Sequence, residues 1–379
     1  MTNTPKRIAV IGAGSMGSQA MWRLAARGAD VVGYDRYAPG HDRGAAGGDT
    51  RIYRSGNLWD AAYIPLLRLA DRMWDQLQEE TGRVLRSRNG CLVMGETRSP
   101  SMQVLLSSIA DHDLDHEMLE RDDFARRYPQ HVLPEGHTAV LDRAGGIIRP
   151  EASVQAAAAR AEQLGARLHR YTPVREVVPV AGGGVDVVTE TATDHVDAAV
   201  VTAGPWINTL LPDLSGAVKI LRVINSWHIP TTHDWFAGNA PPFVRSVPHA
   251  SHGMPSPDGL SVKIGLSRAH YQEVPDPERL DRTVDPSELG IFREFIRDFM
   301  PDLNPDPMRL SVYMDGYTSS ANPLVGQLPG QEDIVVLAGF SGAGFKLSPA
   351  MGEIAADLAL DGASEHPIGF LSPAGLGVV

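Results

Sequence analysis

The sequence of 379 residues predicts an α/β fold in which a parallel sheet is combined with a second, mixed or antiparallel sheet. Three observations favour this fold. Residues 8–35 read as a strand, a glycine turn, a helix and a second strand. Apolar strands near residues 198 and 334 each run into a glycine-containing loop. Residues 219–315 are richer in proline and contain short alternating strands such as 260–266, which are typical of antiparallel sheets.

The turn after the first strand has the sequence Gly12-Ala-Gly-Ser-Met-Gly17. Gly12 permits the tight turn, Gly14 lets the backbone approach a pyrophosphate, and Gly17 lets the helix pack close to the strand. Asp35 ends the second strand, where a ribose hydroxyl needs an acceptor. Together these residues predict a Rossmann-like unit that binds a dinucleotide. They do not decide between NAD and FAD.

The remaining segments indicate how the chain is divided. We expect helices at about 16–27, 64–82, 151–164 and 349–360, and strands at 91–94, 177, 185–188, 198–202 and 334–337. The first strand and helix need partners from near residues 200 and 335, so the nucleotide domain should be discontinuous. We predict that residues 1–84, 146–217 and 318–379 form it, and that residues 85–145 and 218–317 form a substrate-binding domain.

Composition limits the possible partners. A net charge of −12 argues against nucleic acid or an anionic membrane surface, because both favour a basic partner. No apolar run reaches the ~20 residues of a membrane span, and the first strand begins too early for a signal peptide. Cys91 is the single cysteine, which excludes an internal disulfide. We therefore expect a cytoplasmic protein without a metal site.

Lysine is scarce, and its positions are informative. The sequence has 34 basic residues, of which four are lysines: Lys6, Lys219, Lys263 and Lys346. Codon bias explains the scarcity, but it does not explain where the remaining lysines lie.

Five segments in order resemble the FAD-dependent D-amino-acid-oxidase superfamily, and within it the monomeric sarcosine oxidase and N-methyltryptophan oxidase group. They are the glycine turn and the stretches 48–54, 203–206, 262–265 and 339–346. The resemblance covers nearly the whole chain. It implies a Rossmann-like FAD-binding domain, a second domain that binds substrate, and oxidation of a C–N bond.

The resemblance also implies roles for single residues. Lys263 matches a lysine that acts through a water to stabilise the anion formed when oxygen takes up an electron. Arg51 matches a residue close to the flavin ring. Arg54 and Lys346 match a cation pair that binds the substrate carboxylate. The alternatives are a solvated strand lysine for Lys263, a surface salt bridge for Arg54 and a charge leading into a helix for Lys346.

Further residues are expected around the two ligands. Tyr317 and Trp227 are candidate walls of the substrate pocket, as are Trp59 and His228. The cofactor is expected to contact Gly12, Gly14, Ser15, Met16, Gly17, Asp35, Arg36, Gly48, Thr50, Arg51, Val174, Gly204, Trp206, Gly342, Gly344, Phe345 and Lys346.

The chain departs from the family pattern in two ways. The family attaches FAD through a cysteine in a strand that corresponds to residues 310–318, and no cysteine occurs there. FAD should therefore be bound without a covalent link. The histidines of the sarcosine pocket are replaced by Ala46-Gly47 and by Ser267, so we expect a pocket without imidazoles.

The function expected from these residues is oxidation of a secondary amino acid, N-methylated or cyclic, to an imine with release of hydrogen peroxide. The expected partners are the amino acid and molecular oxygen, and the enzyme is expected to be a monomer. One alternative is an FAD-dependent dehydrogenase with another acceptor, which would not need Lys263. A second is an NAD-dependent dehydrogenase, which the loop 338–346 disfavours. A third is a flavin-stabilised binding protein with an inactive pocket.

Overall fold

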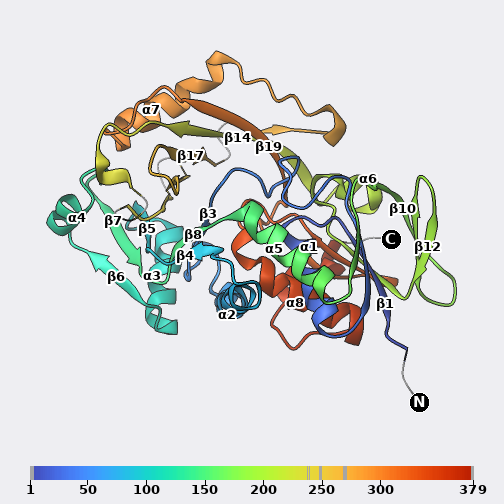
Figure 1. The fold of residues 1–379 in the computed structure, drawn as a ribbon. Helices are drawn as coiled ribbons and strands as arrows, with labels where there is room; N and C mark the ends of the chain where they lie inside the picture. Colours follow the sequence, from blue (N-terminus) through green and yellow to red (C-terminus); the bar gives the residue numbers. More distant parts are fainter. Residues whose placement is uncertain (1–3, 237, 239, 247–249, 268–270, 377–379) are drawn as a thin grey trace.

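The computed structural model describes residues 4–236, 238, 240–246, 250–267 and 271–376. Two large sheets lie beside each other, one with helices packed on one face and the other more open (Figure 1). The expected α/β class with a second mixed or antiparallel sheet is confirmed.

The first sheet has the strand order β20-β21-β13-β1-β2-β9, and all its pairs are parallel except β20 with β21. Its strands are β1 (Arg7–Ile11), β2 (Asp30–Tyr34), β9 (Arg167–His169), β13 (Ala198–Val201), β20 (Leu324–Leu328) and β21 (Gln331–Ala338). They come from three separate segments of the chain, as a discontinuous nucleotide domain requires. The domain boundaries themselves stay a proposal.

Helices cover one face of this sheet, and a small sheet covers the other. Helix α1 packs against α5 and α8, and α2 packs against α8. The bounds are α1 (Ser15–Ala26), α2 (Ile64–Thr81), α5 (Pro150–Gln163) and α8 (Ser348–Asp361). The opposite face packs against β10 (Val174–Pro179), β11 (Val185–Thr189) and β12 (Thr193–Val196). All four predicted helices are present, and their ends differ from the predicted ends by at most one residue.

The glycine turn behaves as its sequence predicts. Gly12 has φ +92°, and a Cβ there would lie 2.7 Å from the carbonyl oxygen of Thr202 at the end of β13. A Cβ at Gly17 would lie 1.8 Å from the carbonyl oxygen of Gly12. Only glycine at both positions lets α1 begin this close to two strand ends.

The second large sheet has the order β18-β14-β17-β16-β15-β5-β7-β6, and β19 also pairs with β14. Its strands are β5 (Cys91–Glu96), β6 (His116–Leu119), β7 (His137–Asp142), β14 (Lys219–His228), β15 (Phe243–Arg245), β16 (Ser251–Pro255), β17 (Val262–Leu266), β18 (Gln272–Glu273) and β19 (Arg309–Tyr317). The β5–β15 pair is parallel, and the other pairs are antiparallel. Helices α4 (Arg121–Arg127) and α7 (Gly290–Phe299) contribute to the core on one face. Helix α3 (Pro100–His112) contributes to a smaller core beside β5.

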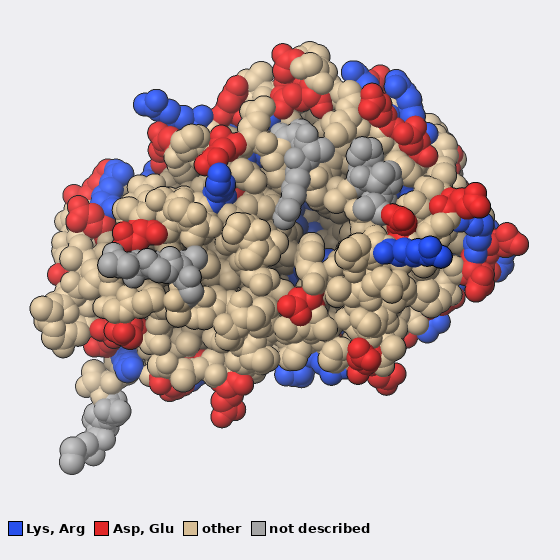
Figure 2. Space-filling model, turned by 180° about the vertical axis from the view of Figure 1, so that it is seen from behind, with Lys and Arg blue, Asp and Glu red and all other residues tan. Residues whose placement is uncertain are grey.

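A short sheet of β3 (Arg51–Tyr53), β8 (Gly146–Ile148) and β4 (Arg86–Ser87) completes the fold. Figure 2 shows acidic and basic side chains interspersed over one face, which is hollowed near its middle. Within the described residues, no helix combines the length and apolar character that a membrane span needs.

Candidate active site

A cavity of about 160 Å³ lies at the carboxyl ends of β1, β2, β13 and β21, and we call it the fingerprint cavity. Its lining includes eleven of the residues expected to contact a cofactor: Gly14, Ser15, Met16, Asp35, Arg36, Arg51, Gly204, Trp206, Gly342, Gly344 and Phe345. A Cβ at Gly14 would project into open space, so the backbone here leaves room for a ligand. Ligands of open α/β sheets bind at such strand ends.

Asp35 also shapes the turn that it was expected to serve. Its carboxylate accepts hydrogen bonds from the backbone N–H groups of Ala13 and Tyr37, each at 2.7 Å. It therefore holds the glycine turn against the end of β2 while lining the cavity.

A smaller cavity of about 50 Å³ continues from the fingerprint cavity, with which it shares Arg36, Ala203 and Trp206. Gly12 and Val174, both expected to contact the cofactor, line it. Four expected residues line neither of these two cavities. Gly17 packs against the turn, and Lys346 lines a third cavity. Gly48 and Thr50 accept hydrogen bonds from Lys263, which also lines that third cavity.

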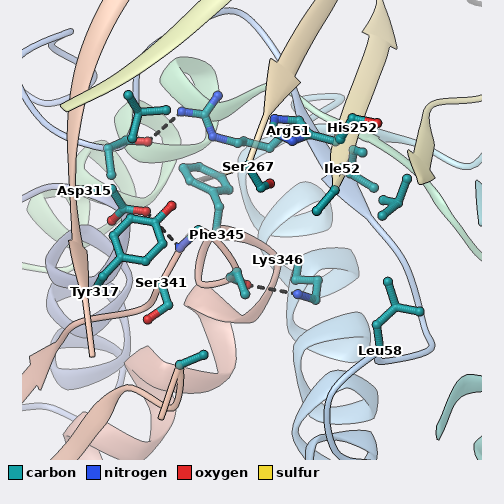
Figure 3. Close-up of a pocket in the computed structure, with 18 of the residues that line it drawn as sticks. Arg51, Ile52, Leu58, His252, Ser267, Asp315, Tyr317, Ser341, Phe345 and Lys346 are labelled. Atoms are coloured by element: carbon teal, nitrogen blue, oxygen red, sulfur yellow. Dashed lines mark hydrogen bonds between the residues drawn. The ribbon is translucent and has the colours of Figure 1, made fainter. Parts of the chain in front are cut away.

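That third cavity, the large cavity, measures about 530 Å³ and lies between β3, the loop 339–346 and the second sheet. It contains all four expected cations, Arg51, Arg54, Lys263 and Lys346. Five residues line both it and the fingerprint cavity: Ala45, Arg51, Asp315, Gly342 and Phe345. The two cavities therefore adjoin, and Figure 3 shows part of their common wall.

Arg54 and Lys346 lie beside the same indole ring, although they are 292 positions apart in the chain. The Cζ of Arg54 is 5.3 Å from the centre of the Trp59 ring, and the Nζ of Lys346 is 5.8 Å from it. Both residues are about 5% exposed, so Arg54 does not belong to a surface salt bridge. Lys346 lies in the short turn directly before α8, so it does lead into a helix, as the alternative for this residue expected. Arg54 Nη1 is buried without a hydrogen bond, and Lys346 Nζ donates to the carbonyl of Ala343 at 3.0 Å. Neither cation has an ion pair with any described residue.

Burial lowers the pKa of the Arg54 guanidinium. Burial, and next the charge of Arg54, lowers the pKa of Lys346 well below its ordinary value. Two like charges held in one buried place without an anion are destabilising. The arrangement is stabilised when an anion binds between them.

Lys263 projects from β17 into the large cavity and is 2% exposed, so it is not a solvated strand lysine. Its Nζ donates to the carbonyl oxygens of Gly48, at 2.8 Å, and Thr50. Burial, and then the neighbouring charge of Arg51, lowers the pKa of Lys263 well below its ordinary value. Arg51 itself donates to the carbonyls of Ala45, Gly47 and Thr50, at 2.6–2.7 Å.

Two of the four residues expected to form the pocket walls line the large cavity, and two do not. Tyr317 and Trp59 line the large cavity. Trp227 does not, although it was expected to bind substrate. Its ring is buried beneath Arg309, whose Cζ lies 3.7 Å from the ring centre. His228 is also buried elsewhere, with its ring nitrogens 2.8 Å from Ser226 Oγ and the carbonyl of Asn304.

The expectation of a cavity without imidazoles is wrong, because β16 brings His252 into the lining. In the antiparallel register His252 faces Gly265, and a Cβ at Gly265 would lie 2.3 Å from the imidazole. Burial, followed by the charges of Lys263 and Arg51, lowers the pKa of His252 to about 3. The imidazole is therefore neutral at physiological pH.

Sequence reasoning also missed Asp315, which lines both the large and the fingerprint cavity. The signal was present in β19, where Tyr313, Asp315 and Tyr317 alternate on one face and all reach the large cavity.

Comparisons with known proteins agree with this geometry. A family model described as "FAD dependent oxidoreductase" matches residues 7–358. The monomeric sarcosine oxidase of Streptomyces avermitilis is 34% identical, covering 97% of this chain and 96% of the relative. This chain belongs to the FAD-dependent oxidoreductase family.

Two further similarities are informative. The N-methyl-L-tryptophan oxidase of Yersinia pestis is 29% identical, covering 93% of this chain and 94% of the relative. The crystal structure of an L-proline dehydrogenase from P. horikoshii superposes with a TM-score of 0.84 at 20% identity and covers 97% of each chain. At this identity, the second similarity shows a shared fold.

The cofactor of the family is FAD, and the residues of this chain fit it. The two smaller cavities form a continuous path from Val174, past the glycine turn, to the junction with the large cavity. Gly14 leaves open space beside the start of α1, where unpaired backbone N–H groups favour a phosphate. FAD extending along this path would bring its reactive ring to the wall formed by Arg51, Gly342 and Phe345.

Proposed function

We propose that the enzyme oxidises the C–N bond of a secondary amino acid, either N-methylated or cyclic, and that oxygen is the final electron acceptor. The observation that carries this proposal is the buried pair of Arg54 and Lys346 beside Trp59. The relatives are named for the secondary amino acids sarcosine and N-methyl-L-tryptophan, which supports the substrate class.

A substrate carboxylate explains this cation pair. A guanidinium can hold both carboxylate oxygens in a fixed orientation, and an ammonium adds a point charge to the same anion. Arg54 Nη1 is a buried donor that no described residue satisfies, so a bound carboxylate would complete its hydrogen bonding. Since Lys346 belongs to the loop that also lines the fingerprint cavity, an anchored substrate lies next to the cofactor path.

The anchored carboxylate fixes where the reaction occurs. FAD, when bound, would supply a two-electron acceptor for a hydride from the carbon next to the substrate nitrogen. The protein holds that carbon against the junction of the two cavities, which raises the rate by positioning. The resulting imine hydrolyses in water or is released as a cyclic imine.

Lys263 is proposed to support the reaction with oxygen, because a buried cation without an acidic ion-pair partner among the described residues stabilises an anion that develops nearby. Its two hydrogen bonds to Gly48 and Thr50 favour a second possibility, in which it mainly holds the loop in place. In that case the enzyme would be a dehydrogenase that passes electrons to another acceptor.

The test is a peroxide assay on purified enzyme with sarcosine, L-proline and N-methyl-L-tryptophan, each compared with its carboxamide. We expect peroxide from at least one of the amino acids and none from the matching amide. Flavin reduction without peroxide in air would favour the dehydrogenase. Equal rates with an amino acid and its amide would contradict the carboxylate site.

A further inference from the structure

The large cavity is lined by five described arginine and lysine side chains and by one carboxylate, which belongs to Asp315. Asp315 is half-buried, and its two oxygens accept hydrogen bonds from the backbone N–H groups of Gly316, at 2.8 Å, and Gly342, at 2.9 Å. Within the described residues it has no ion pair. Each carboxylate oxygen can accept a further hydrogen bond, so Asp315 keeps free capacity toward the cavity.

Asp315 and Lys346 are both hydrogen-bonded to the same short loop. The carboxylate of Asp315 accepts from the N–H of Gly342, and Lys346 Nζ donates to the carbonyl of the next residue, Ala343. In Figure 3, Asp315 and Tyr317 lie on one side of Phe345, and Lys346 lies on the other side of it. The acid and the cation therefore flank the same stretch of cavity wall without contacting each other.

Acidic and basic side chains that line one cavity without pairing with each other suit a ligand that carries both a positive and a negative charge. On the basis of the proposed function, we infer that Asp315 binds the amino group of the substrate, while Arg54 and Lys346 bind its carboxylate. The cavity would thus recognise the zwitterion of an amino acid at both ends, and Asp315 would determine specificity for an amine-bearing acid.

The position of Asp315 suits the oxidation of the C–N bond as well as the charge of the substrate amine. The C–N bond to be oxidised must lie beside the cofactor, so a group that binds the nitrogen must lie where the two cavities meet. Of the five residues that line both cavities, Asp315 is the acid. Burial raises its pKa to about 6, and the two backbone hydrogen bonds and Arg51 oppose that shift. The carboxylate is therefore largely charged at neutral pH, so it can pair with an ammonium group and accept the proton that this group must lose before the C–N bond is oxidised.

The experiment compares ligands that differ only in the nitrogen. L-proline is paired with cyclopentanecarboxylate, and sarcosine is paired with butyrate. Affinities of the FAD-loaded enzyme are measured under anaerobic conditions. The amine-free acids are followed by the change in flavin absorbance, and the amino acids by the concentration dependence of flavin reduction. Wild type, Asp315→Asn and Lys346→Met are compared, with the exposed Asp213→Asn as a matched control.

We expect Asp315→Asn to weaken binding of the amino acids at least ~10-fold and to leave the amine-free acids within ~2-fold of wild type. Lys346→Met should weaken both classes, and Asp213→Asn neither. Asp315→Ser, whose hydroxyl can accept one of the two backbone hydrogen bonds, repeats the comparison should Asp315→Asn fail to bind FAD.

If Asp315→Asn weakens both classes equally, or weakens neither, the assignment of Asp315 to the amine is wrong, whereas the carboxylate site stands. If Lys346→Met leaves both classes unchanged, the proposed function itself is wrong. A changed flavin absorbance spectrum with equal effects on both ligand classes would mean that Asp315 acts on the cofactor, which also overturns the inference.

Discussion

Lys263 is a buried ammonium group that is held by two carbonyl oxygens and has no acidic ion-pair partner among the described residues. Replacing it by methionine keeps much of its volume and removes its charge. If the charge stabilises the anion formed from oxygen, Lys263→Met should slow reoxidation of the reduced flavin by ~100- to 1000-fold. Anaerobic reduction by substrate should change less.

Rapid-mixing absorbance measurements separate these two half-reactions. The matched control is Lys219→Met, because Lys219 is exposed and pairs with Glu273 at 3.3 Å. Unchanged oxygen reactivity in Lys263→Met with normal FAD content would assign this lysine to the loop and favour the dehydrogenase.

Asp315 should also leave a signature in the stability of the protein. Burial raises its pKa from the ordinary 3.8 to about 6, so the folded state binds the proton more tightly than the unfolded state. The stabilisation from the protonated acid is complete below pH 3.8 and is lost as the pH rises through about 6. Wild type should therefore lose up to about 3 kcal/mol relative to Asp315→Asn between pH 4 and pH 7.

Urea unfolding of both proteins across this pH range measures the difference. The variant also loses one backbone hydrogen bond, and this loss lowers its free energy of unfolding by the same amount at every pH. A difference that stays constant from pH 4 to pH 7 would show that Asp315 titrates normally.

The glycine turn between β1 and α1 depends on both backbone conformation and close packing, and two alanine variants separate these effects. Gly12 and Gly28 have φ values of +92° and +80°, but only at Gly12 would a Cβ meet backbone, namely the carbonyl of Thr202 at 2.7 Å. Gly28→Ala should lower the free energy of unfolding by about 1 kcal/mol, and the variant should still bind FAD. Gly12→Ala should lower the free energy of unfolding several-fold more, and the variant should lose FAD.

Flavin content after gel filtration and thermal unfolding measure both consequences. Retention of FAD by Gly12→Ala at the wild-type level would mean that the turn adjusts, and that its closeness to β13 is not what shapes the cofactor path.

The sequence was most informative where function depends on local geometry. The turn at Gly12 and the acid at Asp35 follow from a short run of residues, and α2 follows from its apolar stripe and Gly82. No short local motif of this kind contains His252 or Asp315. Each faces the large cavity because β16 and β19 pair in one particular register, and a shift by one residue would turn both side chains away. Trp227 was misjudged for the same reason.

The chain as a whole offers no thiol to the flavin. Cys91 is buried on β5 and lines none of the three cavities, and β19 contains no cysteine. We therefore predict that trichloroacetic acid releases all flavin into the supernatant as FAD, measured by absorbance and chromatography. Yellow colour that remains in the precipitate would reveal a covalent bond to another residue.

Two distant parts of the chain, β3 with its following residues and the loop 339–346, are proposed to bind a substrate carboxylate together. The most direct test is the apparent KM of Arg54→Ala and Lys346→Ala for the amino acid that the enzyme oxidises, with Lys219→Ala as the control. We expect each cavity variant to keep FAD and to raise KM at least ~10-fold, equivalent to about 1.4 kcal/mol or more, while the control is unchanged. An unchanged KM in both variants, or a simple amine oxidised as well as its amino acid, would contradict the account.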